Sequence, residues 1–243
     1  MLYEWNGINA WTLKATSAEM SIHSLAVFNN KLYGGTYSNG MLLEWNNVSA
    51  WVQKAPQPGA LGYLTSLVVF NNKLYGSADN MLVEWNNVSN VWVQKASPAG
   101  ESQINSLTVF NNKLYAGTYP GGKLVEWDGA NAWVEKAPKL GAETYIQSLA
   151  VFNGKLYGGT GTKGMLYEWN GVDAWVQVAP QLGSVTNIYS LAVFNNKLYG
   201  STNSAGKLLE WGLGSGVGVS RDYASGSVWR HLVAVRDGGA LKL

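Results

Sequence analysis

The chain has 243 residues, of which 47% are hydrophobic and only 13% are charged, and its 17 basic and 15 acidic side chains give a formal net charge of +2. The basic residues are spread along the chain, which argues against a nucleic-acid-binding surface, and no apolar run reaches the roughly 18 residues of a membrane span. The absence of cysteine excludes disulfides and thiolate metal sites.

Three short phrases recur along the chain. The first reads SLxVFN and begins at residues 24, 66, 106, 148 and 190. The second reads LxEW and ends at Trp5, Trp45, Trp85, Trp127, Trp169 and Trp211. The third reads AWVxKA, or a close variant, with its tryptophan at residues 11, 51, 92, 133 and 175. Successive copies of the first phrase are 42, 40, 42 and 42 residues apart, and this period is typical of one four-stranded β-propeller blade.

Each repeat predicts four strands, which we name A to D. Alternating apolar residues predict strand A at 23–29, and an Asn-Asn pair then makes a two-residue turn into strand B at 31–37. Strand C is expected at 41–45 and strand D at 51–55. Because no segment has a sustained helical period of apolar residues, the predicted fold class is all-β.

The length of the loop between strands B and C varies by two residues. Tyr33 and Trp45 lie twelve positions apart, whereas Tyr75 and Trp85 lie ten apart. A two-residue change leaves every side chain on its own face of the sheet, while a one-residue change reverses the faces. We therefore expect the tyrosine of strand B to lie opposite the tryptophan of strand C.

The strand count predicts a five-bladed propeller over residues 1–211, followed by a linker and hairpin-like tail at 212–243. The ring is expected to close by pairing of N- and C-terminal strands, with residues 1–15 completing the last blade. One C strand is then surplus, because MLYEW at 1–5 and KLLEW at 207–211 compete for one position. Since the chain begins in register inside a repeat, we expect a piece of a longer array. A monomer and a strand-swapped dimer both fit this pattern.

The repeated phrases resemble those of the β-propeller superfamily over residues 1–211. Five short blades are similar to tachylectin-type lectins, a resemblance that implies amino-sugar binding in pockets between blades, although no binding residue matches position by position. The tail WRHLVAVRDGGALKL at 229–243 resembles part of a laminin-G or concanavalin-like domain. This second resemblance implies an extracellular or cell-surface protein; the alternative is a leftover hairpin of 232–235 with 240–243.

The repeated glutamates and tryptophans are expected to be structural. The glutamate of LxEW recurs at residues 4, 44, 84, 126, 168 and 210. Glycoside hydrolysis needs two unlike carboxylates at one place, whereas these are equal copies distributed around a ring. We expect each to pair with a repeated lysine, and the tryptophans to wedge neighbouring blades apart rather than to stack on sugars.

The sequence has no recognisable catalytic or metal-binding motif. Its two histidines, His23 and His231, cannot form a metal site alone, and neither a nucleophile elbow nor a phosphate-binding loop is present. The sequence therefore predicts no catalytic residues, no metal and no cofactor, and a protein that is not an enzyme, with a glycosidase as a distant third possibility.

Variation between the repeats is concentrated in the D–A and B–C loops. These loops carry tyrosines, amides and carboxylates, the side chains that stack on sugar rings and bind hydroxyl groups. The candidate ligand-binding residues are Tyr37, Tyr63, Tyr119, Tyr145, Tyr189, Glu19, Glu101, Glu143, Gln103, Asn105, Gln147 and Asn187. The alternative is a solvated loop surface that binds no ligand.

The predicted function is a non-enzymatic, multivalent, lectin-like module that binds carbohydrate at several equivalent shallow sites. A protein–protein interaction scaffold that uses the same loops is the alternative. The expected partners are glycans or surface proteins, without nucleic acid or a membrane span, and an extracellular or cell-surface location is favoured.

Overall fold

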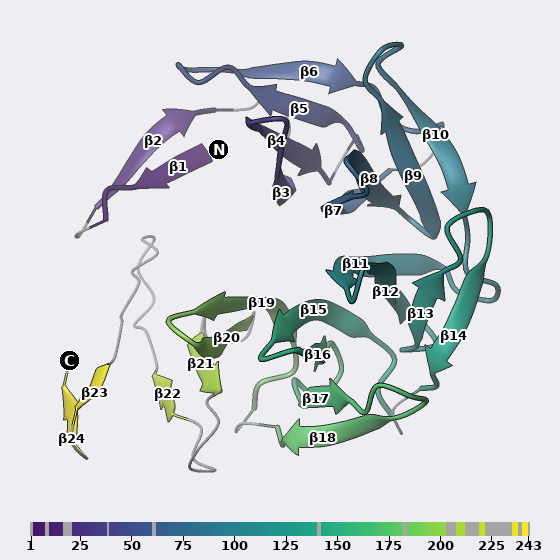
Figure 1. Cartoon of the computed structure of the whole chain (residues 1–243). Helices are drawn as coiled ribbons and strands as arrows, with labels where there is room; N and C mark the ends of the chain where they lie inside the picture. The colour runs from purple at the N-terminus through teal and green to yellow at the C-terminus, as the bar shows by residue number, and fades with distance from the viewer. Residues whose placement is uncertain are drawn as a thin grey trace.

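The computed structural model is an all-β protein, and it describes residues 2–7, 10–16, 21–37, 39–59, 62–139, 142–181, 184–202, 208–211, 219–221, 235–237 and 240–242. Five four-stranded antiparallel sheets stand around a central axis, with strand A of each sheet innermost (Figure 1). The predicted five-bladed propeller is confirmed. No helix among the described segments is long and apolar enough to cross a membrane.

The strands of each blade follow one another in sequence, from A at the centre to D at the rim. Blade 1 contains β3 (Ile22–Phe28), β4 (Lys31–Thr36), β5 (Leu42–Trp45) and β6 (Trp51–Ala55). Blade 2 contains β7 (Leu64–Phe70), β8 (Lys73–Ala78), β9 (Met81–Asn86) and β10 (Val91–Ala96). Blade 3 contains β11 (Gln103–Phe110), β12 (Lys113–Tyr119), β13 (Leu124–Trp127) and β14 (Trp133–Ala137). Blade 4 contains β15 (Ile146–Phe152), β16 (Lys155–Thr160), β17 (Leu166–Trp169) and β18 (Trp175–Ala179).

The fifth blade is completed by a strand from beyond the last repeat. It contains β19 (Ile188–Phe194), β20 (Lys197–Thr202), β21 (Leu208–Trp211) and β22 (Val219–Arg221). The strands β1 (Leu2–Trp5) and β2 (Trp11–Ala15) form a separate two-stranded sheet at the other end of the arc of blades (Figure 1). In this arrangement β21, not β1, fills the C position of the fifth blade.

The tail is described only in part. Its strands β23 (Val235–Asp237) and β24 (Ala240–Lys242) pair as an antiparallel hairpin. Most of the stretch that resembles a laminin-G domain lies outside the described residues.

The Asn-Asn turns form as the sequence predicts. Asn29 and Asn30 have φ angles of 48° and 58°, and blade 4 has Asn153 at 48° and Gly154 at 71°. Two consecutive positive φ angles are the geometry of the two-residue hairpin turn, which asparagine and glycine tolerate best. The turn fixes the register of Phe28 opposite Lys31 in the A–B hairpin.

The serine of the repeated SLxVF phrase forms hydrogen bonds between adjacent blades. Ser24 Oγ accepts a hydrogen bond from Leu67 N in the next blade at 2.7 Å. Ser66 Oγ accepts one from Leu107 N at 3.1 Å. In the fourth copy Ser148 Oγ donates to the Ile188 carbonyl at 3.0 Å. These bonds join the innermost strands around the axis.

The core lies between blades and is built from aromatic triplets. Trp85 of blade 2 packs against Phe28 and Tyr33 of blade 1, with ring centroids 6.3 and 5.2 Å away. The same contacts join Trp127 to Phe70 and Tyr75, and Trp169 to Phe110 and Tyr115. The prediction that the tryptophans separate neighbouring blades is confirmed.

The predicted pairing of strand B tyrosine with strand C tryptophan is wrong by one residue. Tyr33 lies opposite Glu44, while Trp45 lies opposite Trp51 in strand D. The physical reason is a hydrogen bond of 2.8 Å that the Tyr33 hydroxyl donates to Glu44 Oε2. The tyrosine ring still meets a tryptophan, but that tryptophan belongs to the next blade.

Candidate functional site

The disc has two faces with different chemistry. The A–B and C–D turns lie at one end of each blade and form what we call the turn face. The D–A and B–C loops lie at the other end and form the loop face. The turn face repeats the same side chains in each blade, while the loop face carries most of the variation.

On the turn face, each described LxEW glutamate of blades 1 to 3 sits in a small charge cluster. Glu44 Oε1 accepts a hydrogen bond from Lys31 Nζ at 3.0 Å, and Lys54 Nζ lies 3.8 Å from Oε2. Burial raises the pKa of Glu44, but hydrogen bonds from Lys31 and Tyr33 and the charge of Lys54 outweigh it and hold the pKa below its ordinary value. The expected structural role of this glutamate is confirmed.

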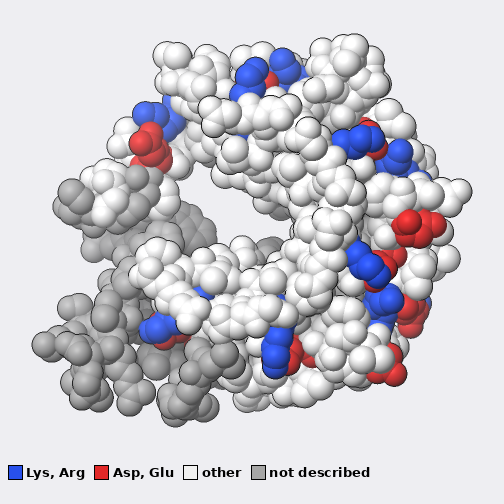
Figure 2. Space-filling view, viewed as in Figure 1, with Lys and Arg blue, Asp and Glu red and all other residues white. Residues whose placement is uncertain are grey.

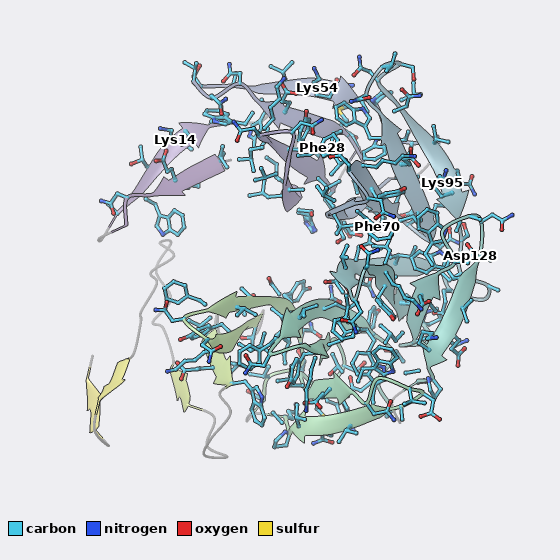
Figure 3. All side chains as sticks on the ribbon, in the orientation of Figure 1. Lys14, Phe28, Lys54, Phe70, Lys95 and Asp128 are labelled. Carbon is cyan, nitrogen blue, oxygen red and sulfur yellow. The ribbon has the colours of Figure 1, made fainter. Side chains whose placement is uncertain are left out.

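The same clusters recur around the ring. Figure 2 shows basic and acidic residues in mixed groups over successive blades, and Figure 3 places Lys14, Lys54 and Lys95 along the outer edge. Blade 4 departs from the pattern because Val178 stands where the D strands of blades 1 to 3 have lysine. Glu168 therefore has Lys155, at 2.6 Å, as its one ion-pair partner among the described residues.

A pocket of about 520 Å³ opens on the turn face between blades 3 and 4. Its wall includes Lys113, Glu126 and Lys136 of blade 3, and Lys155 and Glu168 of blade 4. These charged groups are paired with one another, so the pocket offers no unpaired carboxylate. Sequence reasoning missed this pocket because its residues belong to the repeated phrases, which indicated structure rather than recognition.

The loop face carries stacked tyrosines that bridge neighbouring blades. Tyr37 of blade 1 stacks on Tyr63, which leads into blade 2, with ring centroids 4.3 Å apart, and His23 stacks on the other side of Tyr37 at the same distance. Tyr119 of blade 3 stacks on Tyr145, which leads into blade 4, at 4.1 Å and an angle of 11°. The structure thus brings four of the five candidate tyrosines together in two pairs.

Tyr145 is close to more than one phenol. Its pKa is raised by burial, by a hydrogen bond with Tyr119, and by the charges that Tyr119 and Tyr189 carry when ionised. Tyr189, the fifth candidate tyrosine, is 49% exposed. The row of phenols therefore extends from blade 3 towards blade 5.

The two described candidate glutamates of the loop face are buried, and their carboxylates bind backbone amides of the B–C loops. Glu101 Oε2 accepts a hydrogen bond from Gly121 N at 2.8 Å, and Glu143 Oε2 accepts bonds from the amides of Thr162 and Lys163 at 3.2 and 3.3 Å. Each glutamate of the D–A loop thereby holds the B–C loop of the blade that follows it. Neither side chain is presented to a ligand on the surface.

The remaining candidates occupy the beginnings of the A strands. Gln103, Asn105, Gln147 and Asn187 are all half-buried. The Asn105 amide nitrogen is buried without a hydrogen-bond partner among the described residues. Glu19 lies outside the described residues. The described residues include no group of three or more histidine, cysteine, aspartate or glutamate side chains that could hold a metal ion.

Comparisons with known proteins reveal similarity in fold alone. No family model and no curated protein matches the chain. Virginiamycin B lyase from Staphylococcus aureus is similar in structure, with a TM-score of 0.70 and 11% identity, over 84% of this chain and 70% of that one. A streptogramin B lyase gives 0.69 and 10%, over 88% and 72%. An extracellular domain from B. thetaiotaomicron, described as part of a hybrid two-component system, gives 0.68 and 17%, over 93% of this chain and 31% of that one.

These similarities correct two expectations. The prediction that the chain is not an enzyme is contradicted, because it rested on the absence of recognisable catalytic motifs, and two lyases share the fold of this chain. None of the structures reported above is a tachylectin-type lectin, so the likeness supports the propeller fold and not that family. One of the similar structures is an extracellular domain.

Proposed function

We propose that this propeller binds carbohydrate on its loop face, at the stacked tyrosine pairs Tyr37–Tyr63 and Tyr119–Tyr145. The observation that carries the proposal is the near-parallel stacking of each pair across a blade boundary. Aromatic surfaces favour the apolar faces of sugar rings, while phenol and amide groups beside them bind hydroxyls. Gln103, Asn105, Gln147, Asn187 and Tyr189 are the flanking polar groups in this proposal.

The buried glutamates support the platforms indirectly. Glu143 binds the amides of Thr162 and Lys163, and Gly161 lies directly against the Tyr145 side chain. Holding the loop in one conformation lowers the entropy that ligand binding would otherwise cost. Glu101 and Glu143 are therefore positioning residues for the platforms, not ligands of the sugar.

Between the two platforms lies a junction, that of blades 2 and 3, without a tyrosine stack among the described residues. Asp79 and Gln103 occupy the corresponding positions between blades 2 and 3. Two platforms on one rigid disc can bind one branched or surface-bound glycan together, which raises the apparent affinity above that of either platform. Such ligands suit a protein at the cell surface or outside the cell, and this is the location that we propose.

The proposal is tested by screening the protein on a broad glycan array and by titrating the best ligand into variants. Tyr63→Ala and Tyr145→Ala each remove one tyrosine stack, so we expect each variant to lose one of the two sites. Multivalent binding should then weaken by roughly tenfold or more. The double variant is expected not to bind. Asp79→Asn, at the junction between blades 2 and 3, is the control for general damage to the loop face, because asparagine also tolerates the φ angle of 49° at this position. Absence of any hit on the array, or unchanged binding by the double variant, would contradict the proposal.

A further inference from the structure

The two ends of the arc of blades expose apolar side chains that are buried at the internal junctions. Phe194 of blade 5 is 53% exposed, whereas its equivalents Phe28, Phe70, Phe110 and Phe152 are between 2% and 9% exposed. Leu25 of blade 1 is 50% exposed, whereas its equivalents Leu67 and Leu107 are 7% and 8% exposed. Each end therefore lacks the neighbour that its repeat sequence is adapted to meet.

Strand β1 also lacks a neighbour, because no strand B pairs with it in the described part of the chain. In blades 1 to 4, a strand B supplies a tyrosine and a lysine to the LxEW glutamate. In the described part of the chain β1 pairs with β2 alone, and Glu4 has one ion-pair partner, Lys14 at 2.9 Å. The Glu4 side chain is 64% exposed, compared with 14% for Glu44. The β1–β2 sheet is thus the outer half of a blade.

We propose that strand β20 pairs with β1, so that β1 and β2 replace β21 and β22 as the outer strands of the fifth blade. The hairpin β19–β20 carries Lys197 and Tyr199, which now bind Glu210 at 2.7 and 3.0 Å. Glu4 is the same residue of the same phrase. Transferring the register of Tyr33 opposite Glu44 to this pair sets Tyr199 opposite Glu4 and Ser201 opposite Leu2.

The exchange closes the ring with contacts that already exist at the other junctions. Ser190 Oγ takes a hydrogen bond from Leu25 N, as Ser24 Oγ does from Leu67 N at 2.7 Å. Phe194, which is exposed at present, and Tyr199 pack against the already buried Trp45, as Phe28 and Tyr33 pack against Trp85. Pairing with β20 covers the open edge of β1, and the high effective concentration of two segments of one chain favours it over pairing between copies.

Disulfide trapping tests the proposal directly, because the chain contains no cysteine. The double variant Leu2→Cys/Ser201→Cys reports the proposed pairing, and Ser201→Cys/Leu208→Cys reports the pairing of Ser201 with Leu208. Cross-strand neighbours have the Cα separation that a disulfide needs. We expect the 2/201 variant to form an intramolecular disulfide under mild oxidation, seen as a faster-migrating monomer on a non-reducing gel. A 201/208 disulfide without the 2/201 disulfide, or covalent dimers from the 2/201 variant, would overturn the proposal.

A second measurement avoids the introduced cysteines. In the closed ring Glu4 is bound by Lys197 and Tyr199, so Glu4→Gln is expected to lower the melting temperature by about 2 to 4 °C. Glu210→Gln is expected to change it little, since β21 has left the sheet. The reverse order of the two effects would show that β21 remains in place and would overturn the proposal.

Discussion

Glu101 and Glu143 occupy equivalent places before neighbouring blades, but only Glu101 has an ion-pair partner among the described residues. Lys123 Nζ lies 3.6 Å from Glu101 Oε1, whereas Glu143 Oε1 is buried without a hydrogen-bond partner among the described residues. Met165 stands in blade 4 where Lys123 stands in blade 3. A buried carboxylate oxygen without a partner loses its hydration without compensation. The comparison of the two repeats thus identifies Glu143 as a position where the protein loses stability, which the sequence pattern alone does not show.

Met165→Lys is expected to stabilise the protein, because it supplies Glu143 with the cation that Glu101 already has. A hydrogen bond to a charged group contributes about 1.5 to 3 kcal/mol, part of which is offset by burying the lysine, so we expect a net gain of roughly 1 kcal/mol. Thermal unfolding would record this gain as a rise of about 2 to 4 °C. Met165→Leu is the control for the change in shape, and a Met165→Lys variant no more stable than this control would contradict the prediction.

Val178 provides a second natural comparison between blades. Val178→Lys is expected to give Glu168 the D-strand cation that Glu126 has in Lys136, where the distance is 3.5 Å. Because these pairs are partly exposed, the gain is about 0.2 to 1 kcal/mol, and Lys136→Val is expected to lose a similar amount. Urea unfolding of both variants at low and high salt measures the effect. A gain that persists unchanged in high salt would not be electrostatic and would refute this explanation.

At the scale of the element, the sequence predicted the hairpins well and the contacts between strands less well. The positive φ angles of Asn29 and Asn30 follow from residue type, so the turn and its register were predictable. The pairing of Tyr33 with Glu44 was not predictable. A two-residue difference in loop length shows that each side chain keeps its face of the sheet, but it does not identify the residue on the opposite strand. The repeated tryptophans could be placed between blades, but their partners in the preceding blade could not, because these depend on how the sheets are stacked.

The aromatic triplets make one testable claim at this scale. Trp127 is buried against Phe70 and Tyr75 of the preceding blade. Trp127→Ala is expected to destabilise the protein by about 3 to 5 kcal/mol, since it removes a buried indole and leaves a cavity at the blade junction. Val134→Ala, on the half-exposed strand β14 of the same blade, is expected to cost far less. Equal losses for the two variants in chemical unfolding would show that the triplet does not join the blades.

At the scale of the whole molecule, the repeat length was enough to predict the propeller but not its function. The period gives the number and size of the blades, and structures with 10% to 17% identity share the fold. Function depends on the unlike residues of the loops, and one fold serves enzymes and binding modules alike. For that reason the tyrosines could be chosen as candidates from their residue type. The burial of Glu101 and Glu143 could not be predicted from the sequence, because it depends on the conformation of the loops.

Repeated charge clusters should give the whole molecule a defined pH range of stability. Hydrogen bonds and lysine charges hold the pKa of Glu44, Glu84 and Glu126 below the ordinary value of 4.5, so their contribution is present above pH 4.5 and is lost as the pH falls through the lowered values. The pKa of Tyr75 and of Tyr199 is raised, chiefly by burial, from 10 to about 12, so their contribution is lost as the pH rises from 10 to 12. Urea midpoints measured from pH 3 to 12 should therefore fall at both ends. Changing the three glutamates to glutamine should flatten the acid side. On the alkaline side it should lower the pKa of Tyr75, which Glu84 helps to raise, and leave that of Tyr199, which contacts Glu210, as it is. An equally steep acid side in that variant would assign acid unfolding to other groups.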